Sequence, residues 1–197
     1  ADDTMKRKYF IIPVLCLAFF AFAAYGARKP RNAFPMVNSE EMGSGVDRNM
    51  DTKKMNKGNP APDFEMMDLN GNTVKLSDFA GEKVYIKYWA SWCPICLGGL
   101  EDINTLSAED NGFKVLTIVA PGSKGEKNDE DFKTWFAGVE HTENITVLLD
   151  IDGVYTNRAG VRGFPTSEYI GSDGVLISLA PGHADNETIK STFEAIN

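Results

Sequence analysis

Two cysteines separated by two residues follow directly after a strand-like segment, and this junction constrains the fold more than any other feature of the chain. The segment KVYIKYWA, residues 83–90, is apolar, aromatic and β-branched, a composition typical of a strand buried on both faces. Cys93 and Cys96 come next in SWCPIC, where Pro94 suits the first turn of a helix because it has no N–H to leave unpaired. We therefore expect a buried strand, then a dithiol at the start of a helix that runs to about Ala108.

The residues after Asn59 alternate between strand-like and helix-like patterns. The sequence predicts a β-hairpin turning at Asn70-Gly71, a strand over 113–122, a helix over 128–139, a strand over 145–150, a short helix over 153–161, a hairpin turning at 172–174 and a capped helix over 185–196. This order indicates an α/β sandwich around a mixed sheet. Asp150 and Asp152 are expected to have turn and cap roles, because their loop lacks the remaining ligand pattern of a calcium site.

The cysteine pair allows three interpretations: a metal site, a static disulfide, or a couple that cycles between dithiol and disulfide. Zinc needs four ligands, and only Cys16, His141 and His183 remain to complete a site, none of them close in sequence. A static disulfide is chemically feasible in an exported protein, but closing so small a ring removes little chain entropy and stabilises little. We expect no metal, and no cofactor other than the Cys93–Cys96 pair itself.

A redox cycle explains the local features best. Cys93 at a helix start faces unpaired N–H groups and the positive end of the helix dipole, and both favour the thiolate that attacks disulfides. Cys96, one turn further on, is placed to resolve the mixed disulfide that Cys93 forms. Pro94 and Ile95 put no cation between the sulfurs, whereas strong thiol oxidants stabilise their thiolate in this way. The motif therefore favours a reductant.

A basic cluster at residues 6–8 precedes an uncharged run of eighteen residues from Tyr9 to Gly26. This pattern is typical of an export signal. We expect residues 1–26 to be a signal or membrane-anchor segment, with an uncleaved anchor favoured because cationic residues follow the run at once. Residues 27–59 show no sustained pattern and are expected to be a flexible tether, and residues 60–197 to be the folded domain.

Charge is distributed unevenly along a chain whose net charge is −8. Residues 1–59 carry ten Lys and Arg against six Asp and Glu, whereas residues 60–197 carry ten against twenty-two. So acidic a domain repels phosphate backbones, and no nucleic-acid partner is expected. The same charge disfavours a further negative sulfur, which also favours a reductant.

The stretch GNPAPDFEMMDLNGNTVKLSDFAGEKVYIKYWASWCPIC resembles the opening of the membrane-tethered, thioredoxin-like TlpA/ResA family, and the resemblance extends over about residues 58–197. It implies a thioredoxin fold with an extra N-terminal β-hairpin, and a thiol-disulfide oxidoreductase at the extracytoplasmic face of the bacterial membrane. GVRGFPTS is similar to the family's cis-proline loop, which would make Pro165 face the dithiol; the alternative is an ordinary turn proline. Phe164 would then contact an extended substrate segment, and Trp92 would shield Cys93.

The stretch TIVAPGSKGEKNDEDFKTWFAGV is similar to a segment of the thioredoxin-like N-terminal domain of PilB-type methionine sulfoxide reductases and of their free-standing Gram-positive relatives. This resemblance implies a CcdA/DsbD-like membrane protein as electron donor and methionine sulfoxide reductase as acceptor. Rival functions are reduction of apocytochrome c for haem attachment, and a non-catalytic binding module with a structural disulfide. A peroxidase is disfavoured because no distant resolving cysteine is available.

Two departures from common thioredoxins flank the motif. Lys87 stands where thioredoxin has a buried acid and cannot take over that acid's role as proton acceptor; it is expected either to be buried with a shifted pKa or a carboxylate partner, or to reach out to solvent. Gly98 and Gly99 follow the pair, each costing about 1 kcal/mol against Ala in a helix. We interpret the two glycines as part of a docking face that a partner's backbone approaches closely.

Overall fold

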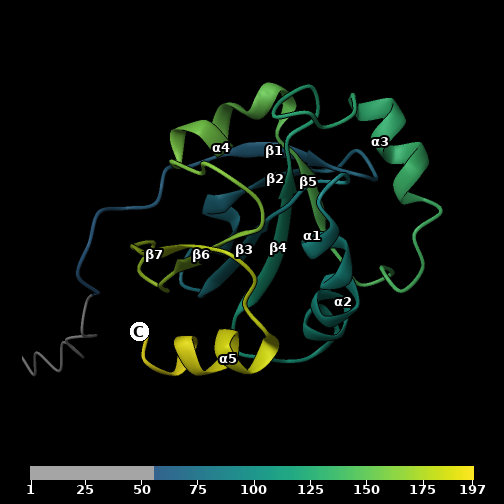
Figure 1. Ribbon diagram of the computed structural model, residues 1–197. Coiled ribbons are helices and arrows are strands. Elements are labelled where there is room, and N and C mark those ends of the chain that lie inside the picture. The colour runs from purple at the N-terminus through teal and green to yellow at the C-terminus, as the bar shows by residue number, and fades with distance from the viewer. Residues whose placement is uncertain (1–55) are drawn as a thin grey trace, which may run out of the picture. The chain divides into compact units, whose positions relative to one another are not determined.

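The computed structural model describes residues 56–197 and places a mixed seven-stranded β-sheet at the centre of the domain (Figure 1). The strands are β1 (Glu65–Asp68), β2 (Thr73–Lys75), β3 (Val84–Tyr88), β4 (Lys114–Val119), β5 (Val147–Leu149), β6 (Thr166–Ile170) and β7 (Leu176–Pro181). The helices are α1 (Pro94–Gly98), α2 (Leu100–Ala108), α3 (Asp129–Phe136), α4 (Val154–Arg158) and α5 (Asn186–Glu194), with 3-10 turns η1 (Leu76–Phe79) and η2 (Ile151–Gly153). The expected α/β arrangement around a mixed sheet is confirmed.

Strand direction brings the ends of distant segments together. In the sheet order β2-β1-β5-β4-β3-β6-β7, the strands β3, β4 and β5 run parallel, so the residues that follow each of them meet at one edge. Strand β6 runs antiparallel to β3, and Tyr88 at the end of β3 pairs with Thr166 at the start of β6. The dithiol segment, the loop after β4 and the segment before β6 therefore share one edge of the sheet.

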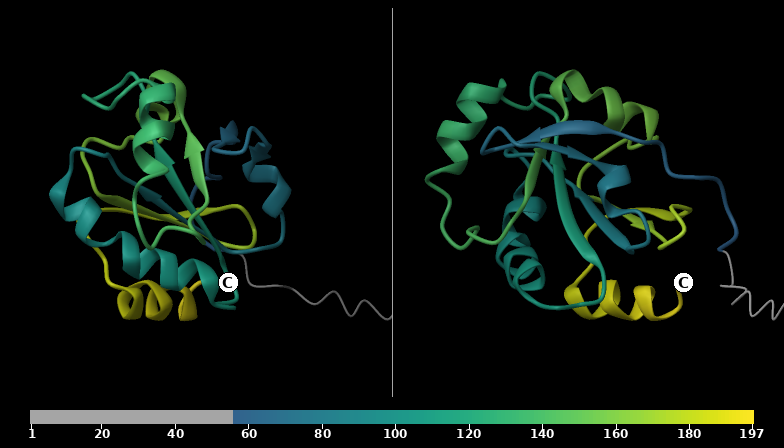
Figure 2. Two further views of the ribbon diagram at one scale, coloured as in Figure 1. Left: turned by 90° about the vertical axis from the view of Figure 1, so that its right-hand side faces the viewer. Right: turned by 180° about the vertical axis from the view of Figure 1, so that it is seen from behind.

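Each face of the sheet carries its own core. One core joins the strands to helices α2, α3 and α5 and includes Tyr85, Trp89, Cys96, Ile103, Phe132, Phe136 and Ile189. The other includes Phe64, Ile86, Tyr88, Leu116, Ile118 and Tyr155 of α4. Figure 2 shows α2 and α5 side by side, where Lys190 forms an ion pair with Glu109. Residues that alternate along β3 therefore enter different cores.

The N-terminal hairpin is confirmed and belongs to the main sheet. Strands β1 and β2 pair around a turn in which Gly71 has φ +83°, and β1 also pairs with β5. Contacts with the domain begin before residue 60. The side chain of Asn56 donates to the carbonyl oxygen of Asn197 at 2.8 Å, and the carbonyl of Asn59 accepts from Leu176 N–H at 3.0 Å. Residues 56–59, expected as the end of a tether, thus contact the folded domain.

The helix expected to run unbroken from the cysteine motif to Ala108 is instead divided at Gly99. Gly99 ends α1 and precedes α2, with φ −103° and ψ 5°. The expected cap role of Asp150 is confirmed, since its carboxylate accepts from Tyr155 N–H at 3.0 Å and Thr156 N–H at 2.7 Å. Asp152 lies in the adjoining turn with φ +59°.

The expected anchor over residues 1–26, Cys16 within it, and most of the expected tether lie outside the described residues. Within residues 56–197, no helix is both long enough and apolar enough to cross a membrane.

Candidate active site

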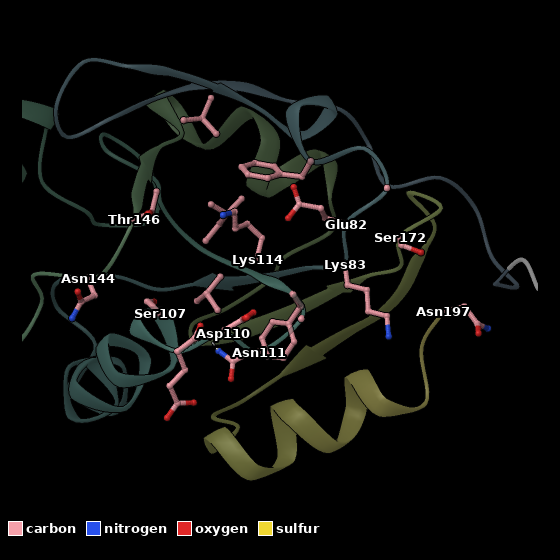
Figure 3. A pocket seen from close by; sticks show the side chains of 18 residues that line it. Glu82, Lys83, Ser107, Asp110, Asn111, Lys114, Asn144, Thr146, Ser172 and Asn197 are labelled. Atoms are coloured by element: carbon pink, nitrogen blue, oxygen red, sulfur yellow. Dashed lines mark hydrogen bonds between the residues drawn. The ribbon is translucent and has the colours of Figure 1, made fainter. Parts of the chain in front are cut away.

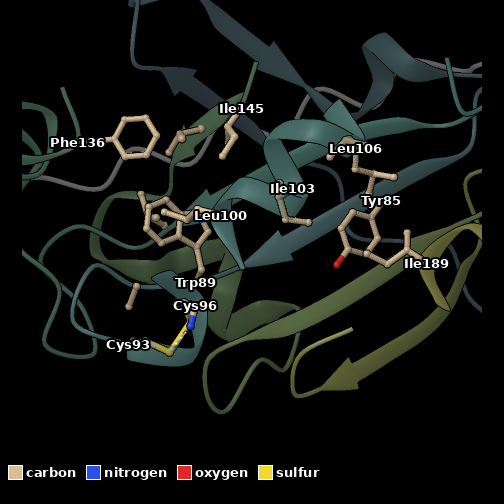
Figure 4. Close-up of a cluster of buried hydrophobic side chains, with 14 of the residues drawn as sticks. Tyr85, Trp89, Cys93, Cys96, Leu100, Ile103, Leu106, Phe136, Ile145 and Ile189 are labelled. Carbon is tan, nitrogen blue, oxygen red and sulfur yellow. Dashed lines mark hydrogen bonds between the residues drawn. A yellow bond between two sulfur atoms is a disulfide. The ribbon is translucent and has the colours of Figure 1, made fainter. Parts of the chain in front are cut away.

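Cys93 and Cys96 form a disulfide at the junction between β3 and α1 (Figure 4). Cys93 is the N-cap of α1, and its sulfur accepts from Cys96 N–H at 3.3 Å. The Cα atoms of the two cysteines are 5.2 Å apart. Cys93 keeps 5% of its surface exposed, whereas Cys96 is fully buried among core residues such as Trp89. Of the two cysteines, Cys93 alone therefore keeps any exposed surface.

The backbone of Phe164, directly before Pro165, lies close to the disulfide, although these two residues are about seventy positions away in the sequence. The Phe164–Pro165 peptide bond is cis, and the carbonyl oxygen of Phe164 is 3.8 Å from Cys93 Sγ. The carbonyl of Pro165 accepts from Gly182 N–H at 2.8 Å, which ties this segment to the end of β7. The antiparallel pairing of β3 with β6 positions the segment beside the dithiol.

An exposed apolar rim surrounds Cys93. Trp92 is 51% exposed and its ring centroid lies 6.1 Å from that of the half-buried Phe164. Ile95 and Leu97 of α1 are 64% and 37% exposed, and Pro94 is exposed as well. Apolar side chains left in solvent around a reactive sulfur can contact an extended segment of another protein.

Lys87 is fully buried, and the alternative that it reaches solvent is wrong. It lies on β3 between Tyr85 and Trp89, both members of the core beneath α2. Its Nζ has no hydrogen-bond partner within residues 56–197. Burial lowers the pKa of Lys87 from 10.5 to about 8, and the negative charge of Asp102 on α2 partly opposes this effect. The carboxylate partner that the sequence suggested therefore acts through its charge without a hydrogen bond.

The two glycines after the motif have different surroundings. A Cβ at Gly98 would have no neighbour within 4 Å, whereas a Cβ at Gly99 would lie 2.9 Å from His183 Cε1. Gly99 is buried and Gly98 is exposed. The imidazole of His183 thus accounts for Gly99 within the chain itself, which corrects the interpretation of Gly99 as part of a docking face. The docking hypothesis stays a prediction for Gly98.

A buried carboxylate beside the motif was missed by sequence reasoning. Glu126, in the loop after β4, accepts from Ser91 N–H at 2.6 Å and from Ser91 Oγ at 2.6 Å. Ser91 directly precedes Trp92 and lies two residues before Cys93. The available signal was topological, because residues that follow neighbouring parallel strands meet at one edge.

A second buried carboxyl group couples β3 to β6 on the other face of the sheet. Tyr88 Oη donates to Glu168 Oε2, and the ring of Tyr155 stacks on that of Tyr88 at 6.4 Å. Glu168 Oε1 has no partner within residues 56–197. Burial raises the pKa of Glu168 above its usual value, although the Tyr88 hydrogen bond opposes this. The pair links the strand that leads to Cys93 with the strand that follows Pro165.

A hollow of about 760 Å³ lies near the starts of β3 and β4, with Lys83, Asp110 and Lys114 among its lining residues (Figure 3). Cys93 follows the opposite end of β3, so this hollow is separate from the dithiol. Within residues 56–197, no group of three or more His, Cys, Asp or Glu side chains is arranged to hold a metal ion.

Comparison with known proteins shows that the domain is similar in sequence to other proteins. Residues 56–196 match the family described as Redoxin. An uncharacterised protein of Haemophilus influenzae is 50% identical over 129 residues, covering 65% of this chain and 82% of its own length. The thiol-disulfide oxidoreductase ResA of Bacillus thuringiensis is 27% identical over 146 residues, covering 73% of this chain and 80% of its own.

Solved structures share the fold. The exposed lipoprotein thioredoxin of Streptococcus pneumoniae matches with a TM-score of 0.66 and 41% identity. The match covers 68% of this chain and 100% of that one. The N-terminal domain of PilB from Neisseria gonorrhoeae has a TM-score of 0.60 and 24% identity over 66% of this chain and 87% of its own. The expected thioredoxin fold and the resemblance to ResA-like proteins are confirmed. At 24% identity the PilB domain supports the fold alone.

Proposed function

This chain belongs to the Redoxin family and is a thiol-disulfide oxidoreductase of the ResA type, and from that premise we propose that it acts outside the cytoplasm as a disulfide reductant. One observation carries the proposal: the cysteine pair at the N-terminus of α1 lies beside the cis-proline segment, and its first cysteine alone keeps some exposed surface. In this proposal Cys93 is the nucleophile and Cys96 the resolving cysteine.

The proposed reaction transfers two electrons in two exchange steps. The Cys93 thiolate attacks one sulfur of a partner disulfide, which forms a mixed disulfide and releases the other partner sulfur as a thiolate. Cys96, after losing its proton, attacks Cys93 Sγ; the Cys93–Cys96 bond forms and the second partner thiolate leaves. The partner thiolates take up two protons, matching the two that the dithiol gave up. The complete burial of Cys96 supports this order of attack, because Cys93 alone of the pair keeps some exposed surface.

Charge around the motif supports the direction of transfer. Pro94 and Ile95 carry no charge, so no cation between the cysteines stabilises the Cys93 thiolate. Residues 60–197 carry ten Lys and Arg against twenty-two Asp and Glu, and this acidic charge disfavours a further negative sulfur. A dithiol whose thiolate is not stabilised gives up its electrons more readily.

The proposed partners follow from resemblance. The segment over residues 117–139 resembles the PilB-type N-terminal domain, which supports methionine sulfoxide reductase as acceptor and a CcdA/DsbD-like membrane protein as donor. The 41% identity to an exposed lipoprotein thioredoxin supports a location outside the cytoplasmic membrane, with residues 1–26 as anchor or signal. Reduction of apocytochrome c is the competing acceptor reaction.

Trapping the mixed disulfide tests the partner. Cys96→Ser leaves Cys93 able to attack but removes the thiol that resolves, so the partner stays covalently bound. We expect mass spectrometry of the trapped species from cells to identify methionine sulfoxide reductase, released by dithiothreitol. The double variant Cys93→Ser/Cys96→Ser is the matched control and should trap nothing.

Two outcomes would contradict different parts of the proposal. Recovery of cytochrome c maturation factors alone would refute methionine sulfoxide reductase as the acceptor. Failure of the unaltered protein to reduce insulin disulfides would refute the reductase function and favour a structural disulfide.

A further inference from the structure

The side chain of Glu126 forms a buried network with the segment that leads into the dithiol. Only 7% of Glu126 is exposed. Its two oxygens accept from Ser91 N–H at 2.6 Å, Ser91 Oγ at 2.6 Å and Lys127 N–H at 2.7 Å. A carboxylate out of water is costly unless such donors compensate it, so this one is held in a defined place.

The Lys127 side chain completes the network. Its Nζ donates to Ser91 Oγ at 2.7 Å and lies 5.1 Å from the centroid of the Trp135 ring on α3. In the same loop, Gly125 has φ +81°, and a Cβ there would lie 3.6 Å from Trp92 Nε1. The loop over residues 121–127 therefore contacts Ser91 and leaves room only for a glycine-sized to alanine-sized residue beside Trp92, the residue before Cys93.

Ser91 lies between β3 and α1, where neither a strand nor a helix supplies a partner for its backbone N–H. The neighbouring amides bond elsewhere: Trp89 N–H to the Ile118 carbonyl at 3.1 Å, and Cys93 N–H to the Ala90 carbonyl at 3.2 Å. Glu126 is the acceptor for this residue, which lies two positions before Cys93.

We propose that Glu126 is a positioning residue for the exchange reaction, acting through Ser91 to hold Cys93 in the geometry that Cys96 needs for resolution. The inference goes beyond the proposed function because it concerns the intramolecular step and holds for any partner. Loss of geometry in such a step costs rate because the effective concentration of the attacking group falls.

Ellman's reagent, a small aromatic disulfide, tests the proposal on the reduced full chain. The first thionitrobenzoate is released when Cys93 attacks the reagent, and the second when Cys96 displaces the group left on Cys93. For Glu126→Ala, we expect the second release to slow by about tenfold or more, while the bimolecular first release changes less than about threefold. Glu126→Gln keeps an acceptor for Ser91 N–H and should lose no more than about threefold in the second release.

The matched control is Glu130→Ala, because Glu130 is an exposed acid on α3. It should leave both releases unchanged; an equal slowing there would overturn the proposal. A folded Glu126→Ala protein with an unchanged second release would also overturn it, since a merely structural role lowers stability without altering this step. If Glu126→Ala does not fold, amide hydrogen exchange in the unaltered protein decides: the Ser91 amide must be protected, and exchange at the rate of an open loop would refute the proposal.

Discussion

The amine of Lys87 shows how a single residue can oppose the stability of the core that contains it. Its position on β3 is evident from the sequence, but its burial depends on α2 and β6, which cover the strand from elsewhere in the chain. An amine without a hydrogen-bond partner in an apolar core favours its neutral form, and its pKa is about 8. The folded state therefore binds this proton less tightly than the unfolded state does.

Lys87→Met should stabilise the protein at neutral pH. Below pH 8 Lys87 is charged in both states, and the folded state bears the full cost of burying that charge. Above pH 10.5 the lysine is neutral in both states. Between these values the free energy of unfolding of the parent protein therefore rises with pH, and the advantage of the variant falls. The shift corresponds to about 3 kcal/mol at most, and we expect a gain of roughly 2–3 kcal/mol at pH 7. Urea unfolding of the oxidised protein from pH 7 to 10.5 measures the difference, because the Cys93–Cys96 pair does not titrate as a disulfide. Parallel curves for parent and variant would contradict the explanation.

At the scale of an element, the break between α1 and α2 separates the two glycines. The sequence predicts one continuous helix from the cysteine motif to about Ala108. Only the packing of His183 against Gly99 reveals why a side chain is absent there. Contacts of this kind join residues more than eighty positions apart, and no local pattern reports them.

Replacing each glycine by alanine should have different effects. Gly98→Ala should raise the free energy of unfolding by about 0.5–1 kcal/mol, because its Cβ meets open space and alanine favours the helix. Gly99→Ala should instead lower it, because the Cβ meets the His183 ring. In the background of His183→Ala, the Gly99→Ala penalty should disappear. Urea unfolding of the four variants measures this, and a penalty that persists without His183 would show that the imidazole is not the cause.

At the scale of the whole molecule, the charge of the domain and the uncharged motif act in the same direction. The acidic charge disfavours the Cys93 thiolate, and the motif supplies no cation to stabilise it. We therefore expect a standard potential near the roughly −270 mV of thioredoxin, and far from the roughly −120 mV of the oxidant DsbA. Equilibration with glutathione or dithiothreitol buffers measures it. A potential near that of DsbA would refute the proposal that the protein is a reductant.

A cation placed between the sulfurs should raise that potential. Ile95 is 64% exposed and can be replaced by lysine without burying charge, whereas Leu97, 37% exposed, lies just outside the pair. Ile95→Lys should therefore shift the potential upward, and Leu97→Lys should shift it less. Equal shifts would mean that overall charge, and not position between the cysteines, sets the potential.

The sequence by itself determined the elements and the chemistry: the buried strand, the N-terminal hairpin, the helix start with its cysteine pair, and the acidic character of the domain. These follow from periodicity, composition and spacing, which act over short stretches. Only the tertiary structure decided which distant groups surround the pair: Phe164 beside Cys93, His183 against Gly99, Glu126 on Ser91, and the closed environment of Lys87. The physical reason is that strand pairing and core packing join residues far apart in the chain, and the free energy of those contacts is set by the fold as a whole.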